Sequence, residues 1–554
     1  MNLANLRRYA IFALGFIGWA VGSSVAQQDP IVPIPATGEF RIAGTVLSAS
    51  GGTPLSRARV FIADDKDRGR QRTLVTGDDG RFSFTQVPAG KYSLAAAKRG
   101  FVTAAYDQHE QFATAIVTGA GLDTENLTLR LQPAAMLTGK VLDEAGEPVR
   151  AANVTLYRED HRSGVSQVLR SANEETDDQG AYEFAFLAPG TYFVSASARP
   201  WYAVHPPTPG PEEAGQTSVD PSLDVAYQTT YYEDSAEPDE ALPIPIKGGD
   251  RLEVTLHLSP VPALHLRVHI DGNGEHGFTI PNFQQPSLDG TDYVPTNGAQ
   301  MISPGQWEIS GVPAGKYIVR MPSQDGTPNG SEMEMSFTSD GEELDISKAE
   351  TDATVKAHVK MAGDGPLPAN LSVELLNARQ KPAFGNVINA KGEVEILSVT
   401  PGRYSFYAVG ANKAYSVVAV SDHGHMLAGH AIDVSAGSTS EVTLTIAEGN
   451  ATVEGFARKN GKPAAGAMVV LVPQNPESNR ELFRRDQSDQ DGSFAVRGVA
   501  PGSYTVVAIE DGWELDWSAP AVIAYYLRHG MPVTISAGQT GSERLSASVE
   551  VQSK

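Results

Sequence analysis

Residues 79–92 read DGRFSFTQVPAGKY, and this stretch decides the fold. Its skeleton is a glycine, a second glycine ten residues later, and a tyrosine two residues after that. The skeleton occurs five times with unchanged spacing: Gly80, Gly90 and Tyr92; Gly180, Gly190 and Tyr192; Gly305, Gly315 and Tyr317; Gly392, Gly402 and Tyr404; Gly492, Gly502 and Tyr504. Because a recurring pattern of this kind is typical of repeat proteins, we expect one structural unit five times.

The residues between the two glycines are predicted to form a strand. Apolar side chains stand two, four and seven residues after the first glycine in every copy, as Phe82, Phe84 and Val87 do after Gly80. Side chains alternate along a strand, so offsets of two and four lie on one face. The residues between them are mostly polar or small and suit a solvated face. The pattern therefore predicts a strand with one buried face.

Both glycines of the skeleton are expected to occupy turns. The first follows an aspartate in Asp79-Gly80 and Asp491-Gly492, dipeptides that favour positive φ and start a hairpin strand. A proline stands one or two residues before the second glycine in every copy. Since proline pre-sets φ next to a turn, the second glycine is expected to need the freedom that only glycine has. We therefore predict positive φ at Gly90, Gly190 and Gly502.

A second motif precedes the skeleton in the first, second and fifth copies. It is a Gly-x-Pro turn with a valine six residues after the proline, as in Gly52-Thr53-Pro54 and Val60. The fourth copy is one residue shorter there, and the third lacks the turn. Strictly alternating segments such as residues 127–131 end the units and lead into the next. Many short strands with turn signals at regular spacing indicate β-sandwiches rather than a parallel sheet.

The predicted fold is all-β, a tandem array of about five immunoglobulin-like or prealbumin-like antiparallel β-sandwiches. The third module is the degenerate member, and a Pro-rich insertion at residues 205–245 interrupts the second. The predicted boundaries are a signal peptide at 1–26, a linker at 27–38, and modules at 39–133, 134–261, 262–350, 351–448 and 449–554.

Several short motifs of the first copy, taken together, carry a family resemblance. They are Gly44-x-Val46, Gly52-x-Pro54, Ala58-x-Val60, Thr76-x-x-Asp79-Gly80-x-Phe82-x-Phe84, Val87-Pro88-x-Gly90-x-Tyr92-x-Leu94 and Gly100-Phe101. They resemble the carboxypeptidase regulatory-like domain, which has a transthyretin-like, carbohydrate-binding-like fold. Copies one, two and five match well, copy four in part, and copy three only around its glycines. The resemblance implies secreted bacterial modules that supply an architecture and no catalytic residues.

The N-terminus has the form of a secretory signal peptide. Arg7 and Arg8 precede an uncharged apolar run at residues 9–21, and Ser24-Val25-Ala26 offers small residues for cleavage after Ala26. A membrane anchor is the alternative, but a spanning helix needs about 20 apolar residues. We expect no transmembrane segment after cleavage, and a secreted, extracytoplasmic protein of the periplasm or cell surface.

Composition narrows the possible partners. The formal net charge is −23, from 43 basic and 66 acidic residues, so nucleic-acid binding through a basic surface is not expected. The chain has no cysteine. A secreted protein without disulfides must hold each module together by its own hydrophobic core.

No motif for catalysis is present. There is no His-Glu-x-x-His zinc motif, no Gly-x-Ser-x-Gly nucleophile elbow and no Gly-x-x-x-x-Gly-Lys phosphate loop. His423, His425 and His430 lie close in sequence, but no carboxylate or thiol stands at ligand spacing, so a polar loop is favoured over a metal site. We predict no catalytic residue, no cofactor and no metal.

Aromatic pairs are the remaining candidates for ligand binding. Exposed aromatic faces stack on sugar rings, and tryptophan and tyrosine suit half-solvated positions. The alternative is that each pair closes the open end of its own sandwich. The candidate residues are Trp201, Tyr202, Tyr231, Tyr232, Trp513 and Trp517.

These observations predict an extracytoplasmic, non-catalytic binding or scaffold protein. Its candidate partners are carbohydrate or another protein of the cell envelope. Two alternatives stay open, a hydrolase suggested by the carboxypeptidase association and a pure structural spacer.

Overall fold

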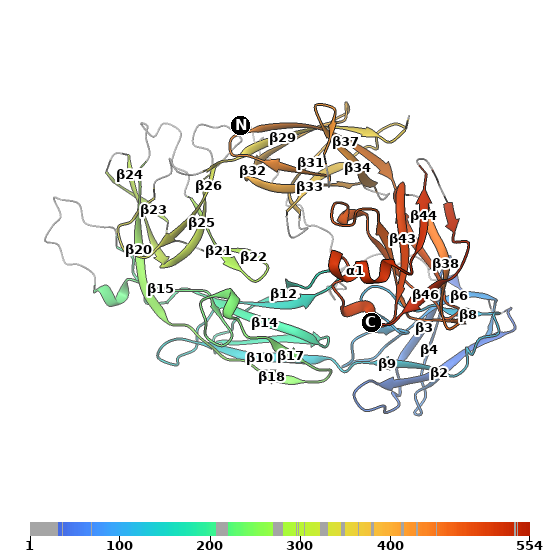
Figure 1. The fold of residues 1–554 in the computed structure, drawn as a ribbon. Coiled ribbons are helices and arrows are strands. Elements are labelled where there is room, and N and C mark those ends of the chain that lie inside the picture. The colour runs from blue at the N-terminus through green and yellow to red at the C-terminus, as the bar shows by residue number, and fades with distance from the viewer. Residues whose placement is uncertain are drawn as a thin grey trace, which may run out of the picture.

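The computed structural model describes residues 32–35, 37–67, 69–206, 220–269, 281–294, 296, 298–303, 305–321, 331–344, 350–363, 365–377, 382–410, 415–427, 430–449, 451–536, 539 and 541–554. The predicted signal peptide at 1–26 lies outside these residues. The described chain forms five β-sandwich modules that follow one another around a ring, so that the C-terminal module lies beside the N-terminal one (Figure 1). No helix in the described part of the chain is long and apolar enough to span a membrane.

The first module packs two sheets face to face. Its strands are β1 (Val32–Pro33), β2 (Phe40–Ser48), β3 (Arg59–Asp64), β4 (Arg70–Val75), β5 (Arg81–Val87), β6 (Gly90–Ala97), β7 (Ala104–Ala105), β8 (Ile116–Thr118) and β9 (Leu127–Leu131). One sheet has the order β5-β2-β9 and the other β1-β4-β3-β6-β7, with β8 on β6. Most pairs are antiparallel, but β2 pairs in parallel with β9, so the last strand returns to the first. Ile42, Phe84 and Tyr92 are buried in the core between the sheets.

The second module repeats this plan. Its strands are β10 (Ala135–Leu142), β11 (Asn153–Asp160), β12 (Gln167–Glu175), β13 (Ala181–Leu187), β14 (Gly190–Ser197), β16 (Thr230–Tyr231), β17 (Ile244–Ile246), β18 (Arg251–Glu253) and β19 (Leu256–His257). The sheets have the orders β13-β10-β18 and β12-β11-β14-β16. The insertion also contains the 3-10 turns η1 (Pro221–Leu223) and η2 (Pro238–Glu240).

The third module is completed by a strand from the second module's insertion. Its own strands are β20 (Pro260–His269), β21 (Asn282–Ser287), β22 (Gly290–Tyr293), β23 (Ala299–Ser303), β24 (Gln306–Pro313), β25 (Gly315–Met321), β26 (Ser331–Phe337), β27 (Glu343–Leu344) and β28 (Glu350–Thr351). Strand β15 (Val225–Tyr227) pairs antiparallel with β20 and extends that sheet. The insertion therefore joins two modules.

A buried histidine that lies between two carboxylates accompanies this strand pairing. His265 on β20 is almost fully buried, with Nε2 at 2.7 Å from Asp224 Oδ2 of the insertion and Nδ1 at 3.1 Å from Glu308 Oε1 of β24. The hydrogen bond with Glu308, together with Asp224 and against the effect of burial, raises the pKa of His265 to about 9. The imidazolium therefore links the insertion to the core of the third module.

The last two modules follow the same plan, and the fifth adds the only α-helix of the described residues. The strands of the fourth are β29 (Ala353–Met361), β30 (Ser372–Leu376), β31 (Pro382–Val387), β32 (Glu393–Val399), β33 (Gly402–Val409), β34 (Tyr415–Asp422), β35 (His425–Met426), β36 (Ala431–Val434) and β37 (Thr439–Glu448). The elements of the fifth are β38 (Ala451–Lys459), β39 (Lys462–Pro463), β40 (Met468–Pro473), η5 (Arg480–Leu482), β41 (Arg484–Gln487), β42 (Ser493–Val499), β43 (Gly502–Ile509), η6 (Gly512–Glu514), α1 (Pro520–Leu527), β44 (Met531–Ile535), β45 (Gly541–Arg544) and β46 (Val549–Gln552).

The tyrosine of the repeated skeleton has the same role in all five modules. Its hydroxyl donates a hydrogen bond to the backbone carbonyl four residues earlier. The oxygen–oxygen distances are 3.2, 2.8, 2.5, 3.0 and 2.9 Å for Tyr92, Tyr192, Tyr317, Tyr404 and Tyr504. A Cβ added at Gly90 or Gly502 would lie 3.5 or 3.2 Å from the ring of the following tyrosine. The second glycine therefore leaves room for this ring, which explains the constant spacing.

The prediction of positive φ at the second glycine is wrong for Gly90, which begins β6 without it. The prediction is confirmed for Gly190 and Gly502, where φ is 158° and 156°. The first glycine is the one with left-handed backbone. Its φ is 70°, 69°, 79°, 79° and 78° at Gly80, Gly180, Gly305, Gly392 and Gly492. The hairpin turn before the strand therefore needs glycine in every module, and the proline-containing turn favours glycine in the second, fourth and fifth modules, where φ of Gly190, Gly402 and Gly502 is positive.

Candidate functional site

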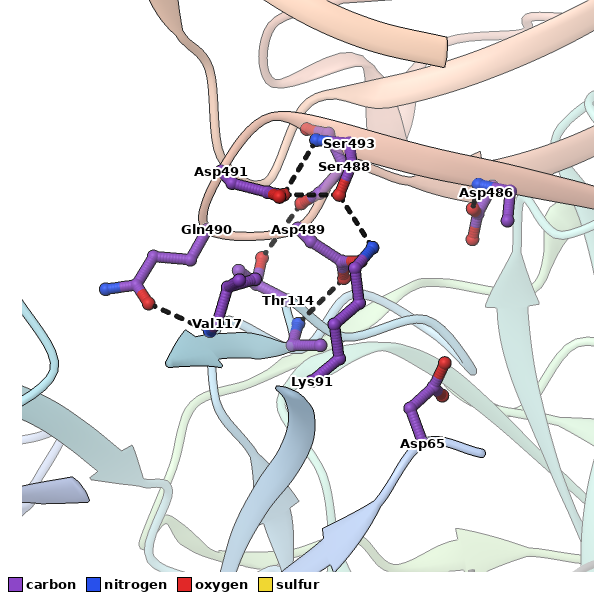
Figure 2. A network of polar contacts seen from close by, with 12 residues as sticks. Asp65, Lys91, Thr114, Val117, Asp486, Ser488, Asp489, Gln490, Asp491 and Ser493 are labelled. Atoms are coloured by element: carbon purple, nitrogen blue, oxygen red, sulfur yellow. Dashed lines mark hydrogen bonds and ion pairs between the residues drawn. The ribbon is translucent and has the colours of Figure 1, made fainter. Parts of the chain in front are cut away.

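Polar side chains form much of the contact between the fifth and first modules (Figure 2). Lys91, on β6, places Nζ 2.6 Å from Asp489 Oδ2 and 2.6 Å from Ser493 Oγ. Asp489 lies in the turn between β41 and β42, and its second oxygen accepts a hydrogen bond from the backbone N–H of Ala115 at 3.0 Å. Both charged side chains are largely buried, so neither could lose its partner without leaving a poorly solvated charge.

Two glutamines extend this contact, Gln490 at β8 and Gln487 at the segment before it. Gln490 Oε1 accepts from the backbone N–H of Val117 at 3.2 Å, as Figure 2 shows. Gln487 is buried and donates from Nε2 to Thr114 Oγ1 at 2.8 Å and to the carbonyl of Asp107 at 2.6 Å. Because these bonds engage backbone groups of the first module, they fix the position of the fifth against it.

Arg485 joins three modules. Its guanidinium donates to Glu110 Oε2 of the first module at 2.7 Å and to the carbonyl of Arg162 of the second at 3.0 Å. It also lies over the ring of Trp517, 4.3 Å from the centroid. Its side chain is 5% exposed. A planar guanidinium suits this role because it can bind a carboxylate and stack on an aromatic face at once.

The tryptophans of the fifth module belong to the same contact. Trp513 and Trp517 are 7% and 5% exposed. The Trp513 ring stacks on His109 with centroids 5.0 Å apart, and Phe112 lies 5.6 Å from it. Both side chains are thus covered by the protein: Trp513 packs across the boundary with the first module, and Trp517 lies against Arg485 and beside Gly164 of the second module.

The fifth module also contacts the second and fourth. The N–H of Ser166 donates to Asp516 Oδ1 at 2.7 Å, and the N–H of Ser518 donates to the carbonyl of Gly164 at 2.9 Å. On the other side, His430 Nδ1 of the fourth module lies 2.7 Å from Glu481 Oε1. The C-terminal module is therefore the part of the chain that closes the ring.

Two carboxylates near this contact have altered acidity. Burial raises the pKa of Asp486 to about 6, although it accepts a hydrogen bond from the N–H of Ala495 at 2.7 Å. Burial also raises the pKa of Asp489, while Lys91 opposes the shift. The ring-closing contact thus contains acidic groups that titrate above the usual range of aspartate.

The other aromatic candidates lie in the second module. Trp201 is 84% exposed and meets the Tyr202 ring edge-on, with centroids 5.8 Å apart. The hydroxyls of Tyr202 and Tyr227 both donate to the carboxylate of Glu144. Tyr231 is 1% exposed, and Tyr232 packs against the core. The structure therefore presents Trp201 fully to solvent and Tyr202 in part.

His423 and His430 of the fourth module have different partners. His430 pairs with Glu481 of the fifth module, whereas His423 contacts its neighbour Asp422 at 2.5 Å. Among the described residues, no group of three or more histidine, aspartate or glutamate side chains is arranged to hold a metal ion.

The ring-closing residues were not identified by sequence reasoning. Lys91, Glu110, Arg485, Gln487 and Asp489 belong to no motif that indicates a contact between modules. A signal that could have found Arg485 is its position on a strand whose neighbours Arg484, Asp486 and Gln487 are all polar or charged, since such a strand must find polar partners if it is buried.

Comparison with known proteins gives one family and several structures. The carboxypeptidase regulatory-like domain matches residues 41–132 and 136–216. The sequence has no match among curated proteins. Solved structures with similarity include the Bacillus anthracis TIE protein, with 13% identity, a TM-score of 0.17 and 74% of each chain covered. They also include a streptococcal ancillary pilin, with 10% identity, a TM-score of 0.20, and 55% of this chain and 98% of that one covered. The chain thus carries two carboxypeptidase regulatory-like domains, at residues 41–132 and 136–216, in its first and second modules.

Proposed function

We propose that this protein is an extracytoplasmic, non-catalytic scaffold whose modules are held as a closed ring by the fifth module. The observation that carries the proposal is Arg485, which bonds the first and second modules from within the fifth. A spacer has no need of such a contact, because a spacer works by its length. A closed ring instead fixes the directions in which the loops and grooves of each module face.

The structure of the contact supports a lasting closure. It combines a partly buried ion pair, a bond from Gln490 to the backbone of β8 and an aromatic cluster that includes Phe112, Trp513 and Trp517. Buried charged groups and bonded glutamines are costly to expose unpaired. Closure therefore holds the fifth module in one position.

Amide hydrogen exchange on the mature protein tests the closure. The N–H groups of Ala115 and Val117 donate to side chains of the fifth module, so they should be protected. Arg485→Ala should accelerate their exchange at least tenfold. Arg403→Ala is the matched control, because Arg403 forms an exposed ion pair within the fourth module, and it should leave both amides unchanged. Fast exchange of both amides in the unmodified protein would refute the closed ring.

Two further measurements test the remaining parts of the proposal. Secreted protein should begin at Gln27, which follows the expected cleavage site, and retention of Met1 would contradict export. Purified protein should lack stoichiometric zinc and peptidase activity. A chelator-sensitive peptidase would favour the hydrolase alternative instead.

Carbohydrate binding is the second candidate function. The observation that favours it is the solvent-exposed indole of Trp201 beside the ring of Tyr202, a surface on which the apolar face of a sugar can stack. A glycan array probed with the mature protein tests it, and Trp201→Ala should weaken every positive signal.

A further inference from the structure

A groove with a volume of about 530 Å³ lies where the second and third modules meet. This volume is in the range of small-ligand sites. The walls come from both modules, with Arg150, Asn153 and Arg199 on one side and Gln285 and Tyr293 on the other. Strand β15 of the insertion lines the groove as well. The strand that pairs with β20 of the third module therefore also forms part of the groove wall.

The charge of the groove is opposite to that of the chain. The net charge of the protein is −23, yet among the described residues that line the groove none is an aspartate or a glutamate. Arg150 and Arg199 are both exposed, and no carboxylate in the described part of the chain lies within ion-pair distance of either guanidinium. Two arginines without acidic partners favour an anionic ligand.

One of these arginines is held in place. A terminal nitrogen of Arg199 donates to the carbonyl of Thr296, in the third module, at 2.8 Å. The rest of its fork stays available, and a guanidinium fork binds a carboxylate by two parallel hydrogen bonds. The contact between the two modules therefore orients a carboxylate-binding group toward the groove.

One exposed aromatic ring lines the groove, and a second belongs to a residue next to a lining residue in sequence. Tyr293, at the end of β22, lines the groove and is 61% exposed. Trp201, which is 84% exposed, lies between the lining residues Pro200 and Ala203 in sequence. Flat exposed rings suit the apolar face of a sugar ring, whereas an acidic peptide has no such face to offer.

We propose that this groove binds an acidic oligosaccharide. The C6 carboxylates of a uronic-acid glycan would pair with Arg150 and Arg199, Asn153 and Gln285 would bond its hydroxyls, and Tyr293 would stack on a sugar face. The inference rests on the proposed function, because the groove keeps its shape only while the second and third modules hold their relative position.

Titration calorimetry on the mature, full-length protein tests the inference with three probes. They are a galacturonic-acid oligosaccharide, a neutral glucose oligosaccharide of equal length, and an oligoglutamate peptide. We expect binding of the uronate alone, weakened by added salt. The double variant Arg150→Ala with Arg199→Ala should lose at least tenfold in affinity, and Tyr293→Ala about fivefold.

Matched controls separate site effects from loss of folding. Tyr525→Ala removes another exposed aromatic ring, and Arg403→Ala another exposed arginine, and neither should change the affinity. Equal binding of the neutral glycan or of oligoglutamate would overturn the inference, as would no binding at all or full binding by the arginine double variant. The exchange of the Ala115 and Val117 amides reports on the ring independently of glycan binding. The closed ring and the glycan site can therefore be refuted separately.

Discussion

Nζ of Lys91 lies 2.6 Å from Oδ2 of Asp489, although 398 residues separate them in sequence. Ion pairs over such a separation do not arise from local structure, so this one exists only because the fifth module returns to the first. Lys91 also bonds Ser493 Oγ at 2.6 Å, which orients the ammonium toward the acidic turn (Figure 2). The strength of this ion pair therefore reports on ring closure.

Lys91→Met and Asp489→Asn should be coupled in their effect on the free energy of unfolding. A double-mutant cycle followed by denaturant unfolding should give a coupling of about 1–2 kcal/mol, because the pair is largely but not fully buried. Arg403 and Asp433 form an exposed pair at 3.1 Å and serve as control, with an expected coupling below about 0.5 kcal/mol. Equal coupling in the two cycles would argue that the contact of Lys91 with Asp489 adds nothing to closure.

Stability of the third module should fall as pH rises. The pKa of His265 is about 9 in the folded protein, above its unfolded value of 6.5, because Glu308 and Asp224 bond its protonated form. A raised basic pKa gives stability that is fully present below pH 6.5 and is lost as pH rises through 9. We expect a loss of about 2–3 kcal/mol between these limits. Hydrogen exchange of β15 measures it.

His265→Gln separates this effect from general alkaline unfolding. The variant keeps a side chain that can bond one carboxylate but removes the titrating group. It should be less stable than the unmodified protein at pH 6, and its β15 exchange protection should not show the step between pH 6.5 and 9. A step of equal size in the variant would assign the titration to another group.

The ionised form of Asp486 should lower the free energy of unfolding of the fifth module above pH 6. Its folded pKa of about 6 exceeds the unfolded value of 3.8, since burial disfavours the charged form. The cost is therefore complete above pH 6 and disappears as pH falls toward 4. Asp486→Asn keeps an oxygen for the N–H of Ala495 and should gain about 1–3 kcal/mol at pH 8 and little at pH 4. Thermal unfolding at both pH values measures the gain, and an equal gain at pH 4 would refute the assignment.

The sequence was sufficient for the repeated part of the fold because the signals are local. The skeleton from Gly80 to Tyr92 specifies a turn, a strand and a hydroxyl–carbonyl bond within 13 positions. The same stretch also indicates a β-bulge. Apolar offsets of two, four and seven cannot lie on one face of a regular strand, and a β-bulge resolves this. The residue at offset six has positive φ in all five copies: Gln86, Phe186, Gly311, Ser398 and Gly498.

The contacts between modules could not be predicted in this way. Lys91, Arg485 and Asp489 are ordinary surface residues of a single sandwich, and only the arrangement of whole modules brings them together. The same holds for β15, whose partner β20 belongs to another module. The sequence makes Trp513 and Trp517 candidates for ligand binding, but sequence alone cannot tell a ring that meets a ligand from one that meets another module.

Substitution of the two glycines of one skeleton should have unequal effects. Gly492 has φ of 78°, and a Cβ there would lie 2.5 Å from the backbone oxygen of Ala457, on the adjacent first strand of the module. Neither the backbone at Gly492 nor the oxygen of Ala457 can move away without a large cost in free energy. Gly492→Ala should therefore destabilise the fifth module by at least about 1–2 kcal/mol.

Gly502 also has positive φ, at 156°, but the nearest neighbour of an added Cβ there is a side chain, the Tyr504 ring at 3.2 Å, and not a backbone atom. This ring can shift slightly while its hydroxyl keeps the bond to Ala500, so Gly502→Ala should cost clearly less than Gly492→Ala. Calorimetry of both variants in the full chain compares the two costs. A larger loss of stability in Gly502→Ala would mean that the turn at the second glycine is the more important of the two. The fixed spacing would then reflect backbone conformation and not the space that the tyrosine ring needs.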